Sequence, residues 1–550
     1  MSVITFILLA LLAYSNAQDL VVNIPQGALK GFVDIDRIGN EFYSFMNIPY
    51  AVPPLENLRF RAPVPATSWE GIREVNRVVP QCVQCGFGGC PGTEDCLYLN
   101  VYTPQFPDAN NTLKPVMIDI HGGAFTGGSA GDGPHHLITK DVIVVTINYR
   151  VGIFGSFSVD DPELGVPGNA GMKDQSLAIK WVRDNIRYFG GDQDNIMIFG
   201  DSAGAASVHL QVLSPMSKGL FQKALCQSGV ALFDLMNGVR NNGILMAQQL
   251  GIQTENLPEM LNSLHTPLVE IESNEPAFLP EEILTLIQTG NYNHVPFVIG
   301  HNNAEGLFIH IPVKLMTGQN ITITDFTGYI PPDLQIQPGI PVKLMTGQNI
   351  TITDFTGYIP PDLQIQPGSE EEAIIAARIR EFYYGDTEPS PSDITQAIQL
   401  ITDYTFAFPS YRAAKEHFKT AQYPIYFYYF SSDTLLNIFK RVEEVAANFP
   451  GASHTDEKAY LFRFGHTPDI QPGSVEEQAL ERLVTLWTNF AKYSTPTTAN
   501  DDIAWEPIAD DTFKFLHFDT YQSTLRTGAP QPANMAFWEQ LYDDFFPGKI

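Results

Sequence analysis

Basic residues are scarce in this 550-residue sequence, and the scarcity already excludes some partners. Lysine and arginine together number 32, against 61 aspartates and glutamates, which gives a formal net charge of −29 at pH 7. Nucleic acids and anionic membranes carry negative charge themselves and do not attract so acidic a chain. We therefore expect neither as a partner, and the plainer consequence of the charge is solubility.

Apolar runs long enough to span a bilayer are also missing. The N-terminal run at residues 3–14 is too short for a membrane helix, and Ser15-Asn16-Ala17 supplies the small residues of a cleavage site, although no Lys or Arg precedes the run. We interpret residues 1–17 as a secretory signal peptide, with an N-terminal core helix as the alternative. The C-terminal residues carry neither a retention nor a lipid-anchor signal. We therefore expect a secreted, extracellular protein.

Cysteine is limited to five residues, four of which lie close together. The four are Cys82, Cys85, Cys90 and Cys96. In a secreted chain such a cluster indicates disulfides, with three possible pairings, and a zinc knuckle is the alternative. The fifth, Cys226, lies in an apolar run, and we expect it to be a small buried hydrophobe.

Low-complexity linkers are absent as well, which bears on the domain organisation. Signals for strands and helices alternate along the whole chain, and 44% of the residues are hydrophobic, ample for a large core. This alternation favours an α/β architecture. We expect one α/β domain over residues 18–550 rather than a string of modules.

One stretch carries more chemical information than any other. An apolar strand at residues 196–199 runs directly into Gly200-Asp201-Ser202-Ala203-Gly204, and small residues then begin a helix. A serine on so sharp a strand-to-helix turn has its hydroxyl lifted clear of the backbone, and the two glycines permit strained dihedrals and close packing. The pentapeptide alone also fits an ordinary tight turn. The strand before it and the helix after it make Ser202 a candidate nucleophile.

A second glycine-rich loop suggests how an oxyanion is stabilised. The apolar run at residues 116–120 predicts a buried strand, and His121-Gly122-Gly123-Ala124-Phe125 follows it. Consecutive glycines let backbone N–H groups turn toward a common point. We expect Gly122, Gly123 and the N–H of Ala203 to form an oxyanion hole, with an ordinary glycine turn as the alternative. Removing one such donor typically costs about 3–4 kcal/mol of transition-state stabilisation.

Together these motifs resemble those of the type-B carboxylesterase/lipase family of α/β-hydrolases, and within it the insect esterases. The resemblance extends over nearly all of residues 20–545. It rests on residues 94–102, 121–125, 148–150, 174–175, 199–207 and 227–229. It implies the α/β-hydrolase fold, with a large, mostly parallel central sheet and helices on both faces. It also implies a carboxylic ester hydrolase whose partner is a small-molecule ester.

The resemblance also implies partners for the serine. The family places its acid in a Gly-x-x-x-x-Glu-Gly segment after a strand, which matches residues 300–306, so Glu305 resembles the acid. The family's base lies in a loop that matches residues 451–457, so His454 resembles the base. The order serine, acid, histidine is that of α/β-hydrolases. Without the resemblance, neither Glu305 nor His454 stands out.

The implied reaction is a two-step ester hydrolysis. His454 takes the proton of Ser202 as its oxygen attacks the ester, Glu305 fixes the imidazole tautomer, and water later releases the acyl group. No metal or cofactor is needed. We expect activity to fall below about pH 6, because an imidazole base loses its function on protonation.

The same comparison implies structural pairs in the scaffold. Cys82–Cys96 resembles the family's first disulfide, which would leave Cys85–Cys90 as an extra bridge. Two ion pairs also resemble buried pairs of the family: Arg59 with Glu94, and Arg150 with Asp174.

A perfect tandem repeat interrupts the resemblance, because residues 311–339 recur unchanged at 340–368. Two copies make no solenoid, which needs at least three stacked units, so we interpret the repeat as a recent duplication or an error in the assembled sequence. A strand-like run at residues 350–355 would be an exposed edge if unpaired. Lengthening a loop costs only about 0.6 kcal/mol per doubling, so we expect deletion of 340–368 to keep or improve activity. Three Asn-x-Thr motifs are candidate glycosylation sites: Asn110, Asn320 and Asn349, the last two being one site counted twice.

The substrate is less well defined than the reaction. The loop at residues 83–95 is short and has no tryptophan, so a cholinesterase-like cation–π platform is missing there. Asp201 stands where insect juvenile hormone esterases usually have glutamine. We expect a broad carboxylesterase for neutral, apolar esters such as odorant or pheromone acetates or xenobiotics. The alternatives are a juvenile hormone esterase, a lidded lipase, which the acidic character does not support, and a non-catalytic adhesion-type relative, which would have lost the triad.

Overall fold

The computed structural model describes residues 20–84, 90–106, 112–160, 162–232, 268–270, 277–310, 354–390, 393–442, 447–509 and 512–546. Several predicted features lie outside these ranges: the signal peptide at 1–17, Cys85, and the candidate glycosylation sites Asn110, Asn320 and Asn349. Within these ranges no helix combines the length and the apolar character needed to cross a membrane.

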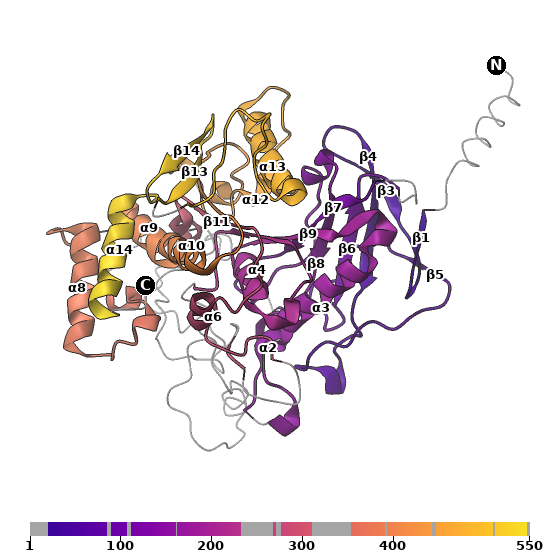
Figure 1. The fold of residues 1–550 in the computed structure, drawn as a ribbon, viewed down its shortest axis with the longest axis horizontal. Helices are drawn as coiled ribbons and strands as arrows, with labels where there is room; N and C mark the ends of the chain where they lie inside the picture. Colours follow the sequence, from indigo (N-terminus) through magenta and orange to yellow (C-terminus); the bar gives the residue numbers. More distant parts are fainter. Residues whose placement is uncertain are drawn as a thin grey trace, which may run out of the picture.

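A mixed sheet of 11 strands forms the centre of the described molecule (Figure 1). In spatial order the strands are β14 (Ser523–Thr527), β13 (Lys514–Phe518), β12 (Ile425–Phe430), β11 (Phe297–Asn302), β10 (Lys223–Gln227), β9 (Gly191–Asp201), β7 (Lys114–Ile120), β8 (Ile143–Ile147), β6 (Tyr98–Thr103), β4 (Glu41–Pro49) and β3 (Phe32–Ile35). Neighbours from β13 to β8 run parallel, whereas both ends of the sheet are antiparallel. The predicted mostly parallel sheet is therefore confirmed.

The central strands are buried on both faces, which explains their composition. All five residues of β8 are buried, and their sequence Ile-Val-Val-Thr-Ile is β-branched throughout. Alternate residues of a strand point to opposite faces, so Ile118 and Ile120 of β7 join one core while Met117 joins the other. The sheet thus divides two separate hydrophobic cores.

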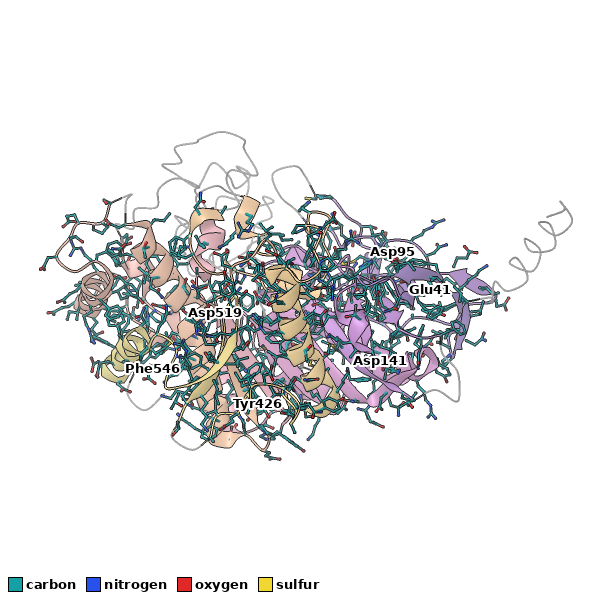
Figure 2. The ribbon with its side chains drawn as sticks, turned by 90° about the horizontal axis from the view of Figure 1, so that it is seen from above. Glu41, Asp95, Asp141, Tyr426, Asp519 and Phe546 are labelled. Carbon is teal, nitrogen blue, oxygen red and sulfur yellow. A yellow bond between two sulfur atoms is a disulfide. The ribbon has the colours of Figure 1, made fainter. Side chains whose placement is uncertain are left out.

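Helices cover both faces, as the α/β class predicts. The first core includes residues of α3 (Ala170–Asn185), α4 (Ala203–Leu213), α6 (Ile283–Thr289) and α10 (Phe408–Thr420). The second core includes residues of α12 (Lys458–Leu461) and α13 (Val475–Tyr493). A small separate sheet contains β1 (Val21–Ile24), β2 (Gly27–Lys30) and β5 (Ile72–Glu74). Figure 2 shows the β4 end, marked by Glu41, and the α14 end, marked by Phe546, at opposite ends of the molecule.

A third core is helical, and the repeat contributes to it. It lies among α8 (Glu370–Tyr384), α9 (Ile394–Thr402), α10 and α14 (Pro532–Phe545). Phe355, Tyr358 and Leu363 of the second copy are buried in it, and Asp362 accepts hydrogen bonds from the side chains of Arg412 and Tyr542. Of the run at residues 350–355 only the last two residues are described, and they are not in a strand. The first copy lies outside the described residues.

Candidate active site

Ser202 occupies a strained turn between β9 and α4. Its backbone has φ 57° and ψ −125°, a conformation that a residue with a side chain adopts at a cost of about 1–3 kcal/mol. The surrounding backbone holds it there, because Ser202 N donates to Gln227 O at 2.9 Å. A Cβ on Gly200 or Gly204 would lie 2.4 Å or 1.9 Å from Ile120 O. Only glycine fits at these two positions, which is the steric reason for the Gly-x-Ser-x-Gly pattern.

Glu305 and His454 lie together although they are 149 residues apart. Glu305 opens a short 3₁₀ helix (Glu305–His310) just after β11, and its Oε1 accepts from Asn302 N at 2.6 Å. Its Oε2 lies 2.7 Å from His454 Nδ1. The Glu305 side chain is fully buried, and that of His454 is 8% exposed. With Nδ1–H donating to the carboxylate, Nε2 is left as the acceptor nitrogen that a general base needs.

The sheet brings the predicted residues to one edge. Carboxyl ends of parallel strands share an edge, and Ser202 directly follows β9 while Glu305 follows β11, with β10 between them. Ser228, the residue after β10, donates to Glu457 Oε1 at 3.2 Å. Glu457 lies three residues after His454, in the loop at residues 451–457 that we call the histidine loop. This bond therefore holds the histidine loop at the same edge of the sheet.

The loop after β7 lies against the nucleophile turn. A Cβ on Gly122 would lie 2.7 Å from Asp201 O and 3.1 Å from Ser202 Cβ, and one on Gly123 would lie 2.3 Å from Gly127 O, so both positions require glycine. Tyr149 fixes the start of the loop, since its hydroxyl donates to His121 O at 2.7 Å. The predicted oxyanion glycines are thus placed beside Ser202, and Ala203 follows as the first residue of α4.

Burial also fixes the charge state of the histidine in this loop. Desolvation lowers the pKa of His121 to about 4, so its ring is neutral near pH 7. Its ring stacks on Tyr149 with centroids 4.3 Å apart. His121 therefore acts as a packed neutral ring and adds no cation to the oxyanion region.

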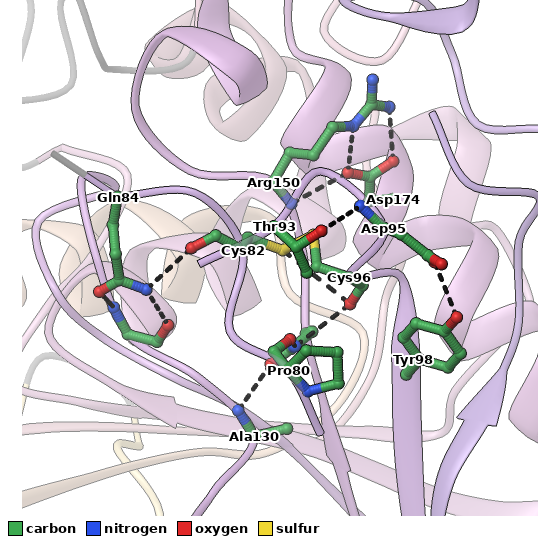
Figure 3. Close-up of a disulfide and its surroundings, with 12 residues drawn as sticks. Pro80, Cys82, Gln84, Thr93, Asp95, Cys96, Tyr98, Ala130, Arg150 and Asp174 are labelled. Atoms are coloured by element: carbon green, nitrogen blue, oxygen red, sulfur yellow. Dashed lines mark hydrogen bonds and ion pairs between the residues drawn. A yellow bond between two sulfur atoms is a disulfide. The ribbon is translucent and has the colours of Figure 1, made fainter. Parts of the chain in front are cut away.

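A disulfide supports the loop that follows β7, which we call the oxyanion loop (Figure 3). Cys82 and Cys96 are joined, and Gln84 links their segment to the loop by donating to Cys82 O at 3.2 Å and to Gly128 O at 3.0 Å. Cys90 is disulfide-bonded as well, whereas its predicted partner lies outside the described residues. Cys226 is a buried free thiol, as expected.

The two ion pairs implied by the resemblance differ in their burial. Arg150 and Asp174 lie 2.7 Å apart with both side chains almost fully buried (Figure 3). Arg59 and Glu94 lie 2.5 Å apart, but the Arg59 side chain is 37% exposed. The expectation of burial is therefore wrong for the second pair, because its arginine lies at the protein surface.

The loop that carries His454 is held by buried side chains that the sequence analysis did not identify. Asp456 accepts from the backbone N–H groups of Ser453 at 2.7 Å and of Lys440 at 3.2 Å. Lys440 is fully buried and donates from Nζ to Gly451 O at 2.5 Å. Burial raises the pKa of the Asp456 carboxyl to about 7.

A buried lysine is the other group that sequence reasoning missed. Lys458 Nζ lies 2.7 Å from Asp201, 3.1 Å from Asp132 and 3.7 Å from Asp119. No motif marks Lys458. One signal did exist, because Asp119 is the polar residue in the otherwise apolar run at residues 116–120 and therefore needs a partner.

Comparisons with known proteins agree with this architecture. A family model described as "Carboxylesterase family" matches residues 18–538. The chain is 30% identical to a carboxylic ester hydrolase of Bombus ignitus, over 100% of this chain and 99% of that one. It is 30% identical to esterase FE4 of Myzus persicae (91% and 90% covered) and 32% identical to juvenile hormone esterase of Tribolium castaneum (90% and 87%).

A solved structure supports the same fold. The crystal structure of juvenile hormone esterase from Manduca sexta, with OTFP covalently attached, superposes with a TM-score of 0.78 and 26% identity. The match covers 96% of this chain and 100% of that one. The predicted α/β-hydrolase fold is confirmed.

Proposed function

Since the chain belongs to the carboxylesterase family and is a carboxylic ester hydrolase, we propose that it is a secreted serine esterase that hydrolyses neutral, apolar esters through an acyl-enzyme on Ser202. The observation that carries the proposal is the buried hydrogen bond between Glu305 and His454, at the sheet edge where the Ser202 turn lies. The N-terminal apolar run and the Cys82–Cys96 disulfide support secretion, because disulfides persist in oxidising compartments.

In the acylation step, Ser202 Oγ attacks the ester carbonyl carbon while its proton passes to His454 Nε2. The carbonyl oxygen becomes an oxyanion, which the N–H groups of Gly122, Gly123 and Ala203 stabilise. The C–O bond to the alcohol then breaks, and His454 returns the proton to the departing alkoxide. The serine is left as an ester of the substrate acid.

Deacylation repeats these steps with water. His454 takes a proton from water as the water oxygen attacks the acyl carbon, and Ser202 Oγ leaves with that proton. Glu305 stabilises the imidazolium in both steps and holds the ring in one tautomer. Its own position is fixed by the bond from Asn302 N.

The charges beside the nucleophile support neutral substrates. Asp201 directly precedes Ser202, but its carboxylate is paired with Lys458 at 2.7 Å and therefore offers no free anion to a cationic substrate. The ring of Phe406 lies 4.3 Å from that of His454 and presents apolar surface there. Juvenile hormone is the second candidate substrate, because relatives from Tribolium castaneum and Manduca sexta carry the name juvenile hormone esterase.

The proposal is tested by comparing the wild type with Ser202→Ala on p-nitrophenyl butyrate. We expect kcat to fall by at least about 10⁴-fold, because the nucleophile of a triad is removed. Ser523→Ala is the matched control: its hydroxyl is buried and has no hydrogen-bond partner among the residues that the structure describes, so we expect its removal to leave activity unchanged. A Ser202→Ala variant with near wild-type activity would overturn the proposal, and a wild type without turnover would favour the adhesion-type alternative.

Substrate choice needs a second experiment. Acetate esters of increasing chain length and juvenile hormone are compared by kcat/KM on the wild type. A smooth preference among apolar acetates supports the broad esterase. A kcat/KM for juvenile hormone about 100-fold above every acetate would instead assign the hormone.

A further inference from the structure

One buried ion pair joins the nucleophile turn to the loop of the base. Lys458 is the first residue of α12 and lies four residues after His454, while Asp201 directly precedes Ser202. Lys458 Nζ lies 2.7 Å from Asp201 Oδ1, and both side chains are 8% exposed. This hydrogen bond therefore joins the segment that carries the nucleophile to the segment that carries the base, across 257 positions of the sequence.

The same ammonium also contacts both sides of the oxyanion loop. Asp119, at 3.7 Å, lies on β7 just before the loop, and Asp132, at 3.1 Å, follows it. Asp201 itself packs against the loop, since a Cβ on Gly122 would lie 2.8 Å from its Oδ2. Lys458 thus stands where the nucleophile turn, the oxyanion loop and the histidine loop meet.

Lys458 is charged in this position. Burial alone would lower its pKa, but Asp119, Asp201 and Asp132 together raise that pKa well above the usual value. A buried ion pair is weak evidence for stability, because well-packed apolar residues often serve as well. The pair instead contributes a directional contact. A paired ammonium and carboxylate hold the two segments at hydrogen-bonding distance, whereas apolar contacts allow the segments to slide.

We propose that Lys458 is a positioning residue for ester hydrolysis, which through Asp201 holds the Ser202 turn in register with the His454 loop. The inference rests on the proposed roles of Ser202 and His454. It adds that the ion pair sets both the alignment of nucleophile and base and the local charge that the imidazole experiences.

Other titratable groups surround the pair, and burial shifts the pKa of most of them. Besides Lys458, the groups that interact electrostatically with Asp201 or face the same ammonium are Asp119, His121, Asp132, Tyr149 and Glu457. Burial keeps His121 and Tyr149 neutral, lowering the pKa of the first and raising that of the second. Burial, reinforced by the nearby Glu305 carboxylate, raises the pKa of Glu457.

The direct test is Asp201→Asn, which keeps the shape of the side chain and removes its charge. We expect kcat on p-nitrophenyl butyrate to fall about tenfold with KM within about twofold, because a small misalignment of nucleophile and base slows the chemical step. Asp201 directly precedes Ser202, the residue that His454 deprotonates in the proposed mechanism, so loss of its negative charge disfavours protonation of the imidazole. The acid limb of the kcat/KM profile therefore moves to lower pH, by about half a unit.

A charge-balanced double variant, Asp201→Asn with Lys458→Met, separates positioning from electrostatics. We expect its acid limb to return to within about 0.2 pH units of the wild type, since both charges are gone, while kcat stays low because the contact is lost. This variant also keeps the test open if the single variant does not fold. Asp132 is 22% exposed and can be hydrated, and burial already raises the pKa of Asp119 to about 7, so that it accepts a proton readily.

The matched control is Glu270→Gln, which alters a comparable ion pair on another part of the fold. Glu270 lies 2.7 Å from Lys173 with both side chains buried, as in the Lys458 pair. We expect this variant to lower the melting temperature without moving kcat or the acid limb. Movement of the acid limb in the control as large as in Asp201→Asn would show that the effect is general loosening and would overturn the proposal.

Labelling with an organophosphate distinguishes failure of the positioning role from failure of the proposed function. If the wild type is labelled on Ser202 while both variants keep wild-type kcat and acid limb, the positioning role is overturned and the proposed function stands. If the wild type turns over no ester and takes no label on Ser202, the proposed function fails and the positioning role fails with it.

Discussion

The turn of Ser202 and the loop of His454 are held by different kinds of contact. Main-chain geometry fixes the turn, because Gly204 approaches Ile120 O too closely for any side chain and the Ser202 backbone is bonded within the sheet edge. The turn is therefore a local structure whose shape depends on a few adjacent residues.

Buried side chains fix the histidine loop instead. Asp456 accepts hydrogen bonds from backbone N–H groups of two separate segments, Lys440 donates to a loop carbonyl, and Lys458 pairs with Asp201, which directly precedes the nucleophile. The two halves of one active site are therefore expected to lose function in different ways. The turn breaks when a single atom is added, whereas the loop weakens by degrees as its contacts are removed one at a time.

The largest expected effect concerns the contact that orients the base. Glu305→Gln removes the carboxylate that accepts from His454 Nδ1, so the imidazole loses its tautomer and its counter-charge. We expect kcat to fall by about 10⁴-fold. Glu457→Gln is the comparison, because Glu457 is equally buried but bonds Ser228 and Asn302 rather than the base. Equal losses in the two variants would contradict the distinction.

Adding one methyl group tests the backbone origin of the turn. In Gly204→Ala the new Cβ would lie 1.9 Å from Ile120 O, so the strand and helix must separate. We expect kcat to fall at least about 100-fold, or the folded yield to be lost, since overpacking against backbone is not relieved by a side-chain rotation. Gly465→Ala, with nothing within 4 Å of its Cβ, serves as the control. Normal circular dichroism and kcat for Gly204→Ala would refute the steric argument.

Weakening the loop is expected to have a graded effect. Asp456→Asn replaces an oxygen by an NH₂ group, so at least one of the N–H groups of Ser453 and Lys440 loses its acceptor. We expect a loss of about 1–3 kcal/mol in unfolding free energy and less than a tenfold fall in kcat. Thermal unfolding and steady-state kinetics measure both. A loss as complete as that of Gly204→Ala would remove the contrast between turn and loop.

A buried histidine next to the turn is expected to make the stability of the protein depend on pH. His209, on the helix that follows Ser202, has its pKa lowered by burial to about 3. Its neutral form is therefore stabilising above the unfolded-state value of about 6.5, and this stability is lost as the pH falls toward 3. In His209→Gln we expect the slope of unfolding free energy against pH, between about 4 and 6, to decrease by about 1.4 kcal/mol per unit. An unchanged slope in denaturant titrations would show that His209 does not titrate as described.

The smallest effect is expected from removing one copy of the repeat. The copies are identical, so deleting either produces the same chain, and 14 residues equivalent to 340–353 would then lead from His310 to Asp354. Such a segment spans up to roughly 45 Å when extended, and the residues that pack into the helical core remain. We expect kcat and melting temperature to stay within error of the full chain. A soluble but inactive deletion variant would contradict this.

The contrast between turn and loop also explains what could be predicted from the sequence. The Ser202 turn is specified by neighbouring residues, so the strand, the glycine spacing and the small-residue helix predicted it without other information. His454 and Glu305 were identified only through the family resemblance, because their contact spans 149 positions and no local pattern encodes it. The pairing of Lys458 with Asp119 and Asp201 has the same character and was not predicted.

The burial of individual side chains could not be predicted from local sequence either. The resemblance implied buried pairs for both Arg59 and Arg150, but whether an arginine is covered depends on neighbours contributed by the whole fold, and Arg59 lies at the surface. The burial of Phe355 and Tyr358 in the helical core depends on α8 and also on α10 and α14, which lie much further along the chain. The sheet, by contrast, follows from apolar β-branched runs such as that of β8.

If one hydroxyl becomes acylated during turnover, covalent labelling identifies it. The wild-type protein is titrated with an organophosphate, the remaining ester hydrolysis is measured, and the labelled peptide is identified by mass spectrometry. We expect activity to fall in proportion to the label and to reach zero at one adduct per chain on Ser202. Complete inhibition with the adduct on any other residue would contradict it.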